Sequence, residues 1–271
     1  MERETPKTFH RRELKPPGVA MSTSEGRALF KEAIAGGAND IYFPLAEVLN
    51  TQAHPAYCGI TSLAVVLNAL LIDPKRTWKG VWRWWSEEML DCCTPLEKIQ
   101  MKGITLGKLN CLAECQGAKS EMVYGTDITL EDFRESIVES CGSLDSSTTK
   151  IIIVSYSRPA LNQTGSGHFS PIGAYHVEKD MVLVLDVARF KLPPHWLPLK
   201  DLHAAMAHVD SDSGKPRGFL TVSSSEELDR RCACEKDCTP MEEDEENDKE
   251  ALIASMKACA HFVSGLKCDN C

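Results

Sequence analysis

The sequence predicts an α+β fold in which a helical part is followed by an antiparallel sheet. Segments with the helical spacing of apolar residues dominate the first half of the chain, whereas apolar runs of strand length follow after residue 150. Elements segregated in this way favour α+β over alternating α/β. The composition, 43% apolar and 25% charged over 271 residues, is that of an ordinary globular protein.

The helices are predicted from apolar spacing and from capping residues. Ser22 or Ser24 is the expected cap of the first helix, and Thr129 lies near the expected cap of the last. After Cys58, apolar residues at i, i+3, i+4 and i+7 indicate a buried helix face: Leu63, Val66, Leu67 and Leu70. The predicted helices are 24–35, a segment from Cys58 to a point before Pro74, and 128–140.

Three strands are predicted in the second half. Residues 151–156 form a continuous apolar run, and two further runs are joined by a turn near Glu178 to Asp180. These further strands are 168–176 and 181–187. With the turn centred near residue 177, Asp186 is expected to lie opposite His168.

The charge predicts a boundary near residue 223. Residues 224–250 hold 12 acidic and 4 basic residues, without apolar periodicity. We therefore expect a folded domain over 1–223 and a mobile, acidic tail over 224–271. This tail carries six cysteines: Cys232, Cys234, Cys238, Cys259, Cys268 and Cys271.

Several classes of protein are disfavoured. The net charge of −9 argues against a partner that is nucleic acid or an anionic membrane. The longest apolar run, Leu63 to Ile72, is shorter than the about 20 residues of a membrane span. The N-terminus lacks the apolar core of a secretory signal, so a cytoplasmic location is expected. In a reducing cytosol the 12 cysteines are expected to be thiols, metal ligands or catalysts.

Cys58 is a candidate nucleophile. It follows Pro55-Ala56-Tyr57 and opens a predicted helix, where the helix dipole and unpaired N–H groups favour the thiolate. Gln52, six residues upstream, and the backbone N–H of Cys58 could together donate hydrogen bonds to an oxyanion. The alternatives are a small buried thiol and a surface amide.

His168 and Asp186 complete the candidate site. His168 follows Gly165-Ser166-Gly167, and Asp186 follows an apolar strand where a carboxylate needs a partner. His168 could hold the thiol proton, and Asp186 could orient the imidazole. Each residue alone is compatible with a structural role. The order Gln, Cys, His, Asp is that of papain-like cysteine peptidases, although the third member here is Asp and not Asn.

The amino-acid sequence around these residues resembles that of a narrower family, the phytochelatin synthases (glutathione γ-glutamylcysteinyltransferases). The resemblance covers about residues 8–222, and its main segments are TQAHPAYCGITSLAVVLNALLIDPKRTWKGVWRWWSEEMLDCC at 51–93 and TGSGHFSPIGAYHVEKDMVLVLDVARFKLPPHW at 164–196. The resemblance implies a papain-like fold. It also implies that Cys58, His168 and Asp186 are catalytic and that Gln52 serves the oxyanion.

The resemblance implies a transpeptidase reaction on glutathione. Cys58 would attack the Cys–Gly amide, glycine would leave, and the γ-glutamylcysteinyl thioester would pass to a second glutathione or to a phytochelatin peptide. Basic residues should anchor the substrate carboxylates. The candidates are Arg189, Lys191 and Arg158, with surface charge or structural ion pairs as the alternative.

The resemblance also implies metal dependence without an organic cofactor. Cadmium, zinc and copper ions are the expected activators, and metal–glutathione thiolates the expected substrates. Candidate ligands in the tail are Cys232, Cys234, Cys238, Cys268 and Cys271. In the domain, Cys92-Cys93 and Cys111 with Cys115 are further candidates, with burial as the alternative.

Two rival functions share these features. A hydrolytic cysteine peptidase would remove glycine from glutathione or its S-conjugates with the same triad. A thiol-rich metal buffer on an inactive peptidase fold would need no catalysis. The four clustered tryptophans are Trp78, Trp82, Trp84 and Trp85. They are expected to form a packed aromatic corner and not a wall of the substrate site.

Overall fold

A computed structural model describes residues 8–142 and 149–224, and over these residues the α+β prediction is confirmed. The described residues form seven α-helices, two short 3-10 helices and one seven-stranded sheet. In chain order the elements are β1 (Val19–Ala20), α1 (Ser24–Ala35), α2 (Tyr42–Val48), α3 (Cys58–Ala69), η1 (Glu87–Met89), α4 (Leu96–Lys102), α5 (Leu106–Cys115), β2 (Ala118–Tyr124), α6 (Leu130–Cys141), β3 (Lys150–Ser157), η2 (Pro159–Leu161), β4 (Gly167–His176), β5 (Met181–Val184), β6 (His195–Pro198), α7 (Leu199–Met206) and β7 (Gly218–Ser224).

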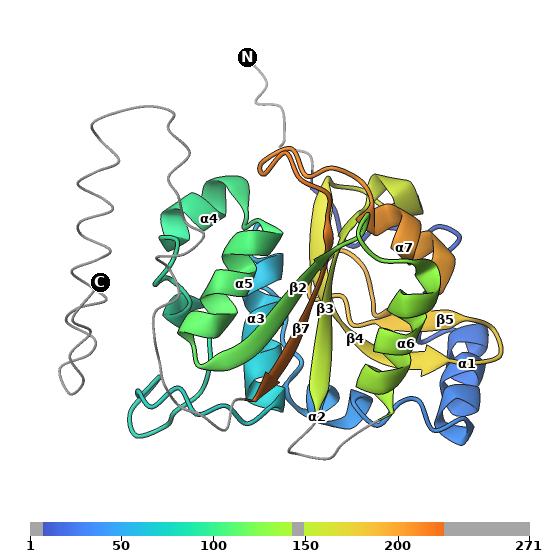
Figure 1. The fold of residues 1–271 in the computed structure, drawn as a ribbon, viewed down its shortest axis with the longest axis horizontal. Coiled ribbons are helices and arrows are strands. Elements are labelled where there is room, and N and C mark those ends of the chain that lie inside the picture. The colour runs from blue at the N-terminus through green and yellow to red at the C-terminus, as the bar shows by residue number, and fades with distance from the viewer. Residues whose placement is uncertain (1–7, 143–148, 225–271) are drawn as a thin grey trace.

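The sheet is antiparallel and lies between two groups of helices. Its strand order is β1-β6-β5-β4-β3-β7-β2. In Figure 1, α3, α4 and α5 lie on one side of the central strands, and α6 and α7 lie on the other. The predicted segregation is only approximate, because β2 comes from the helical half and α7 follows β6. An edge strand such as β2 was missed because its alternation is weak: AKSEMVY.

The central helix α3 positions the candidate nucleophile. Residues 59–68 of this helix are all buried, so the helix is covered on every side. It contacts β4, and the Ser62 hydroxyl donates to the Phe169 carbonyl oxygen at 3.2 Å. A helix that is fixed on all sides holds its first residue, Cys58, in a fixed place.

The predicted element boundaries need two corrections. The cap of α1 is Thr23, whose hydroxyl accepts from the Gly26 N–H at 3.0 Å, and not Ser22 or Ser24. The cap of α6 is Thr129, as predicted. Strand β5 ends at Val184, before the predicted end at 187, so Asp186 lies in the loop that follows the strand.

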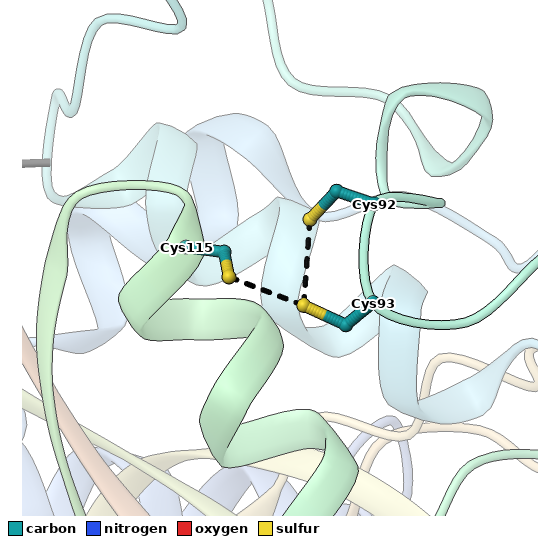
Figure 2. Close-up of side chains that lie close together, drawn as sticks. All are labelled: Cys92, Cys93 and Cys115. Atoms are coloured by element: carbon teal, nitrogen blue, oxygen red, sulfur yellow. Dashed lines mark hydrogen bonds between the residues drawn. The ribbon is translucent and has the colours of Figure 1, made fainter. Parts of the chain in front are cut away.

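The aromatic cluster is only half packed. The Trp85 side chain is 3% exposed and donates to the Ile72 carbonyl oxygen, whereas Trp82 is 72% exposed. The prediction of a packed corner is therefore wrong for Trp82 and for Trp84, which is 39% exposed. Downstream of these residues, a loop brings Cys92 and Cys93 to Cys115 at the end of α5 (Figure 2).

The predicted C-terminal tail and the prediction that no segment spans a membrane concern regions beyond the site. The predicted tail, with Cys232, Cys234, Cys238, Cys268 and Cys271, lies outside the described residues apart from Ser224. Within 8–142 and 149–224, none of the helices is both long and apolar enough to cross a bilayer.

The contact between β2 and β7 predicts a stability effect. A Cβ atom on Gly218 would lie 2.0 Å from the Val123 carbonyl oxygen, which belongs to the backbone of β2. We expect Gly218→Ala to lower the free energy of unfolding by about 1–3 kcal/mol, because the strands must separate.

Gly107→Ala is the matched control. This site in α5 has open space around the added methyl group, and we expect a gain of about 0.5–1 kcal/mol from helix propensity. Urea unfolding of both variants measures the difference. Equal stabilities would contradict the described β2–β7 contact.

Candidate active site

Cys58 is the first residue of α3 and packs against the start of β4. A Cβ on the next residue, Gly59, would lie 2.4 Å from Cγ2 of Ile104 and 3.4 Å from Cδ2 of Phe169, so these two side chains pack directly against the backbone at the start of the helix. Because Cys58 is at the first helical position, its N–H has no acceptor within the helix. The thiol therefore lies where the structure presents an unpaired donor beside the strand that carries His168.

The loop before α3 is fixed to the loop that carries Asp186. The Gln52 N–H donates to the Val187 carbonyl oxygen at 3.0 Å. The Gln52 side-chain amide donates to the carbonyl oxygens of His54 at 2.8 Å and Pro55 at 2.9 Å. Both amide hydrogens are therefore used inside the loop, and the oxyanion role predicted for Gln52 would require one of them to turn.

Glu87 in η1 holds the same loop from the other side. Its carboxylate accepts from the Ala53 N–H at 3.0 Å and from the hydroxyl of Thr61 in α3. The Thr61 hydroxyl also lies 2.8 Å from the Tyr57 carbonyl oxygen. Glu87 therefore ties together the two segments that flank Cys58.

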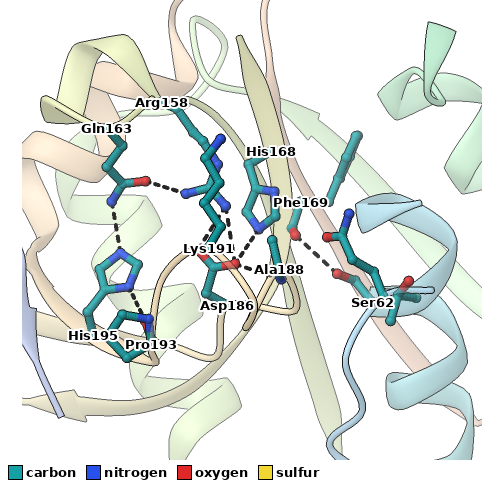
Figure 3. Close-up of polar contacts among 12 residues, drawn as sticks. Ser62, Arg158, Gln163, His168, Phe169, Asp186, Ala188, Lys191, Pro193 and His195 are labelled. Carbon is teal, nitrogen blue, oxygen red and sulfur yellow. Dashed lines mark hydrogen bonds and ion pairs between the residues drawn. The ribbon is translucent and has the colours of Figure 1, made fainter. Parts of the chain in front are cut away.

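His168 and Asp186 come together as a close, buried pair. His168 Nε2 lies 2.9 Å from Asp186 Oδ1, and the two side chains are 4% and 0% exposed. Figure 3 shows the imidazole above the carboxylate. Contrary to the prediction, the two residues do not face each other across the β4–β5 ladder. This ladder runs from the His176–Met181 pair to the Ile172–Val184 pair, and Asp186 reaches His168 from the loop beyond it.

Arg158 lies beside this pair and is buried. Its guanidinium donates to both carboxylate oxygens of Asp186, at 3.1 and 2.8 Å, and its other terminal nitrogen donates to Gln163 Oε1 at 2.6 Å. The Ala188 N–H adds a further bond to Asp186 Oδ1 at 2.8 Å. This placement favours the structural ion pair over substrate binding for Arg158.

The network continues to a second buried histidine. His195 Nδ1 lies 2.8 Å from the Pro193 carbonyl oxygen, which can only accept, so this nitrogen carries the hydrogen. His195 Nε2 then accepts from Gln163 Nε2 at 2.9 Å. This fixes the Gln163 amide so that its oxygen faces Arg158 (Figure 3).

The surroundings set the protonation states of the site. Burial alone would raise the pKa of Asp186, but the charges of His168 and Arg158 outweigh it and hold that pKa well below its ordinary range. Burial, together with the charge of Arg158, lowers the pKa of His168 to about 4. Burial raises the pKa of the Cys58 thiol, against the opposing effects of the Phe169 backbone and Arg158.

The raised pKa of Cys58 and the lowered pKa of His168 favour a neutral thiol and a neutral imidazole in the resting site. The position of Cys58 at the start of a helix had instead suggested a resting thiolate. Because ionised Asp186 only accepts, His168 Nε2 carries the hydrogen and Nδ1 keeps its lone pair. Nδ1 can therefore take the thiol proton during attack, with Asp186 stabilising the imidazolium that forms.

The lowered pKa of His168 predicts a loss of stability in acid. Between the ordinary value of 6.5 and about 4, the unfolded chain binds a proton that the folded chain does not. Stability should therefore fall as the pH falls through this window, by at most about 3 kcal/mol from this residue. The facing charges are Asp186, Arg158 and Lys191, and burial of His195 adds a slope of the same sign.

Urea unfolding at a series of pH values measures this slope. His168→Gln should flatten the slope but not abolish it, because His195 remains. An unchanged slope in the variant would show that His168 is not held neutral.

Lys191 and Arg189 lie at the edge of the network. Lys191 is half-buried, and its ammonium group donates to the Thr164 carbonyl oxygen. Burial and the charge of Arg158 lower its pKa. Arg189 is exposed, three residues beyond Asp186, and has no ion pair with another described residue. Of the three predicted anchors, Arg189 and Lys191 are therefore the ones that a substrate could reach.

The structure thus gathers Cys58, His168, Asp186 and Gln52 around the junction of α3, β4 and the loop after β5. Sequence reasoning missed Glu87, Gln163 and His195, which support these residues. Glu87 contacts residues 26 and 34 positions away. A single sequence carries no signal for such pairs.

The chain matches a protein-family model described as "Phytochelatin synthase" over residues 9–219. It is 51% identical over 217 residues to glutathione γ-glutamylcysteinyltransferase 1 of Arabidopsis thaliana, covering 80% of this chain and 44% of that protein. It is 50% identical over 208 residues to glutathione γ-glutamylcysteinyltransferase 3 of Lotus japonicus, covering 77% and 43%.

A fungal relative matches less closely. The chain is 40% identical over 216 residues to glutathione γ-glutamylcysteinyltransferase of Schizosaccharomyces pombe, covering 80% of this chain and 51% of that protein. The chain thus spans about half the length, or less, of these relatives.

Proposed function

The chain belongs to the phytochelatin synthase family, and we propose that it is a glutathione γ-glutamylcysteinyltransferase of papain-like fold that makes phytochelatins by transpeptidation. The observation that carries the proposal is the His168–Asp186 pair, at 2.9 Å, beside a cysteine at the start of a buried helix. The relatives named above bear the name of this activity. We extend the same activity, glutathione as the substrate and a cytoplasmic location to this chain, which spans about half the length, or less, of these relatives.

The first half-reaction forms a thioester. The Cys58 sulfur attacks the carbonyl carbon of the Cys–Gly amide while its proton passes to His168 Nδ1. The tetrahedral intermediate collapses when His168 returns this proton to the glycine nitrogen, so the C–N bond breaks and glycine leaves. The γ-glutamylcysteinyl group stays on Cys58. Asp186 remains ionised throughout and stabilises the charged imidazole.

The second half-reaction transfers this group. The α-amine of another glutathione, or of a phytochelatin, attacks the thioester carbon and loses a proton to His168. The C–S bond then breaks, and His168 passes this proton to the leaving sulfur, so that the thiol of Cys58 is regenerated. Each cycle adds a γ-Glu-Cys unit to give (γ-Glu-Cys)n-Gly. Attack by water would give hydrolysis, so the acceptor must be held close and water kept out.

Two donors are proposed for the oxyanion. The N–H of Cys58 has no partner within α3 and is the first. The Gln52 amide is the second, and it serves this role by moving one hydrogen from the Pro55 carbonyl oxygen, 2.9 Å away, to the oxyanion. The exchange replaces a neutral acceptor by a charged one, which strengthens the bond.

Arg189 is proposed to bind a carboxylate of glutathione, with Lys191 beside it. We expect Arg189→Ala to raise KM for glutathione by about 10- to 100-fold with little change in kcat, because a charge-assisted hydrogen bond is worth about 1.5–3 kcal/mol. Lys200→Ala removes another exposed cation, from α7, and should leave KM unchanged. Steady-state kinetics decides, and an unchanged KM in Arg189→Ala would remove this residue from the substrate site.

Metal ions enter this proposal as part of the substrate. Cadmium, zinc or copper would bind the thiols of glutathione, since soft ions prefer sulfur. His168 and Asp186 are already paired with each other, so the triad needs no metal of its own.

Product analysis tests the function. Purified chain is incubated with glutathione, with and without cadmium, and the products are identified by mass spectrometry. Oligomers of γ-Glu-Cys with released glycine, absent for Cys58→Ala, would support transpeptidation. Monomeric γ-Glu-Cys alone would replace it by the hydrolytic reaction. Equal products from both proteins, or none, would overturn the proposal.

A further inference from the structure

Four cysteine sulfurs gather at the C-terminal end of α5, away from the triad. Cys93 Sγ lies 3.5 Å from Cys92 Sγ, 3.2 Å from Cys115 Sγ and 3.7 Å from Cys111 Sγ. In Figure 2, Cys92 and Cys93 from one loop face Cys115 from the helix. The sulfurs of Cys92, Cys93 and Cys115 all lie within 4.8 Å of one another.

We propose that Cys92, Cys93 and Cys115, with Cys111 as the fourth ligand, bind one soft d10 cation of the Zn²⁺ or Cd²⁺ class. This site belongs to the protein itself, is separate from any metal carried by the substrate, and does not depend on the proposed function.

The distances fit one thiolate-bound ion. A Zn–S bond is about 2.3 Å, so the sulfurs of a tetrahedral site lie about 3.8 Å apart. The gaps of 3.2 and 3.5 Å from Cys93 to Cys115 and Cys92 need only a small expansion to reach this value. Cys111 Sγ lies 3.7 Å from Cys93 Sγ but outside the group of three mutually close sulfurs, so it would have to turn toward Cys92 and Cys115 to complete the tetrahedron. A donor set made only of sulfur selects soft ions over Mg²⁺ or Ca²⁺.

The local structure also suits a cation. Cys111 and Cys115 are four residues apart on α5, so they share one face of the helix. The Gln116 side-chain amide donates to Cys92 Sγ at 2.9 Å, a bond that stabilises a ligating thiolate.

The accessibility of the cluster completes the argument. Cys92, Cys93 and Cys115 are half-buried, so an ion can reach them, while Cys111 closes the inner side at 8% exposure. The ion would fasten the loop at 92–93, which follows η1, to the end of α5. Metal binding should therefore stabilise the fold, because the ligands come from two separate segments.

Metal protection from alkylation tests the proposal on the unaltered full chain. The protein is reduced, stripped of metal, and pulsed with iodoacetamide in the absence of glutathione, with and without Zn²⁺ or Cd²⁺. Peptide mass spectrometry then measures labelling at each cysteine. We expect labelling of Cys92, Cys93 and Cys115 to slow about tenfold or more, and Mg²⁺ to have no effect. Unchanged labelling at these cysteines would overturn the proposal.

A variant gives a second readout. Cys93→Ser removes the central sulfur, and Cys141→Ser is the matched control, a buried thiol in α6. Both variants retain the remaining cysteines of the chain. After dialysis against a weak chelator, Cys93→Ser should hold one Cd²⁺ fewer than the control and lose part of the thiolate charge-transfer absorbance. Equal metal content in the two variants would overturn the site. The alkylation result decides alone if Cys93→Ser does not fold.

Discussion

Cys58→Ala should abolish turnover of glutathione and leave the fold intact. The substitution removes the sulfur that forms the thioester, and no other described thiol lies at the start of α3. Removing a nucleophile from a triad costs about 10⁴- to 10⁶-fold in kcat, so no glycine release above background is expected. The measurement is the rate of glycine release, together with circular dichroism to confirm folding.

Cys141→Ala is the control for this loss. It deletes a fully buried thiol from α6 and should lower stability, while the activity of each folded molecule stays unchanged. If Cys58→Ala retained more than a small fraction of the wild-type rate, the nucleophile would have to be sought elsewhere in the chain.

Asp186→Asn should damage both catalysis and stability. The carboxylate is fully buried and binds His168, Arg158 and the Ala188 N–H. Its loss leaves the buried guanidinium of Arg158 without a counter-ion, which costs about 3–5 kcal/mol in the free energy of unfolding. The imidazole also loses the negative charge that fixes its tautomer and stabilises its protonated form, and a fall of about 10⁴-fold in kcat is expected.

A double variant separates the two effects. In Asp186→Asn with Arg158→Met, no charge of this buried pair is left unpaired, so part of the stability should return while activity stays low. Urea unfolding and initial rates measure both quantities. Full activity in the double variant would show that the carboxylate serves only the fold.

The sequence predicted best those features that depend on local pattern. The helix starting at Cys58 was predictable because its apolar residues are dense and because Pro74 limits its length. The sequence predicted that Asp186 would orient the His168 imidazole, but it did not predict that Asp186 would do so from a loop. A register shift between Ile172 and Ala174 and the early end of β5 move Asp186 into a loop. A bulge of this kind leaves no reliable mark on a single sequence.

Long-range polar contacts explain most of what was missed. Arg158 was a candidate for substrate binding because basic residues should anchor the carboxylates of glutathione, yet it is 2% exposed beside His168 and Asp186. Its burial depends on Asp186 and Gln163, which are 28 and 5 residues away. Likewise, the cysteines at 92–93 and 111–115 were seen as two pairs. Their union into one cluster depends on how α5 returns to the loop after η1.

The most direct test of the account is the mass of the intact protein during turnover. Wild-type chain is mixed with glutathione, quenched in acid within the first cycle, and analysed by mass spectrometry with peptide mapping. The account predicts one added γ-glutamylcysteinyl group, located on Cys58, released by hydroxylamine and absent from Cys58→Ala. Release of glycine without such an adduct, or an adduct on another residue that persists in Cys58→Ala, would contradict it.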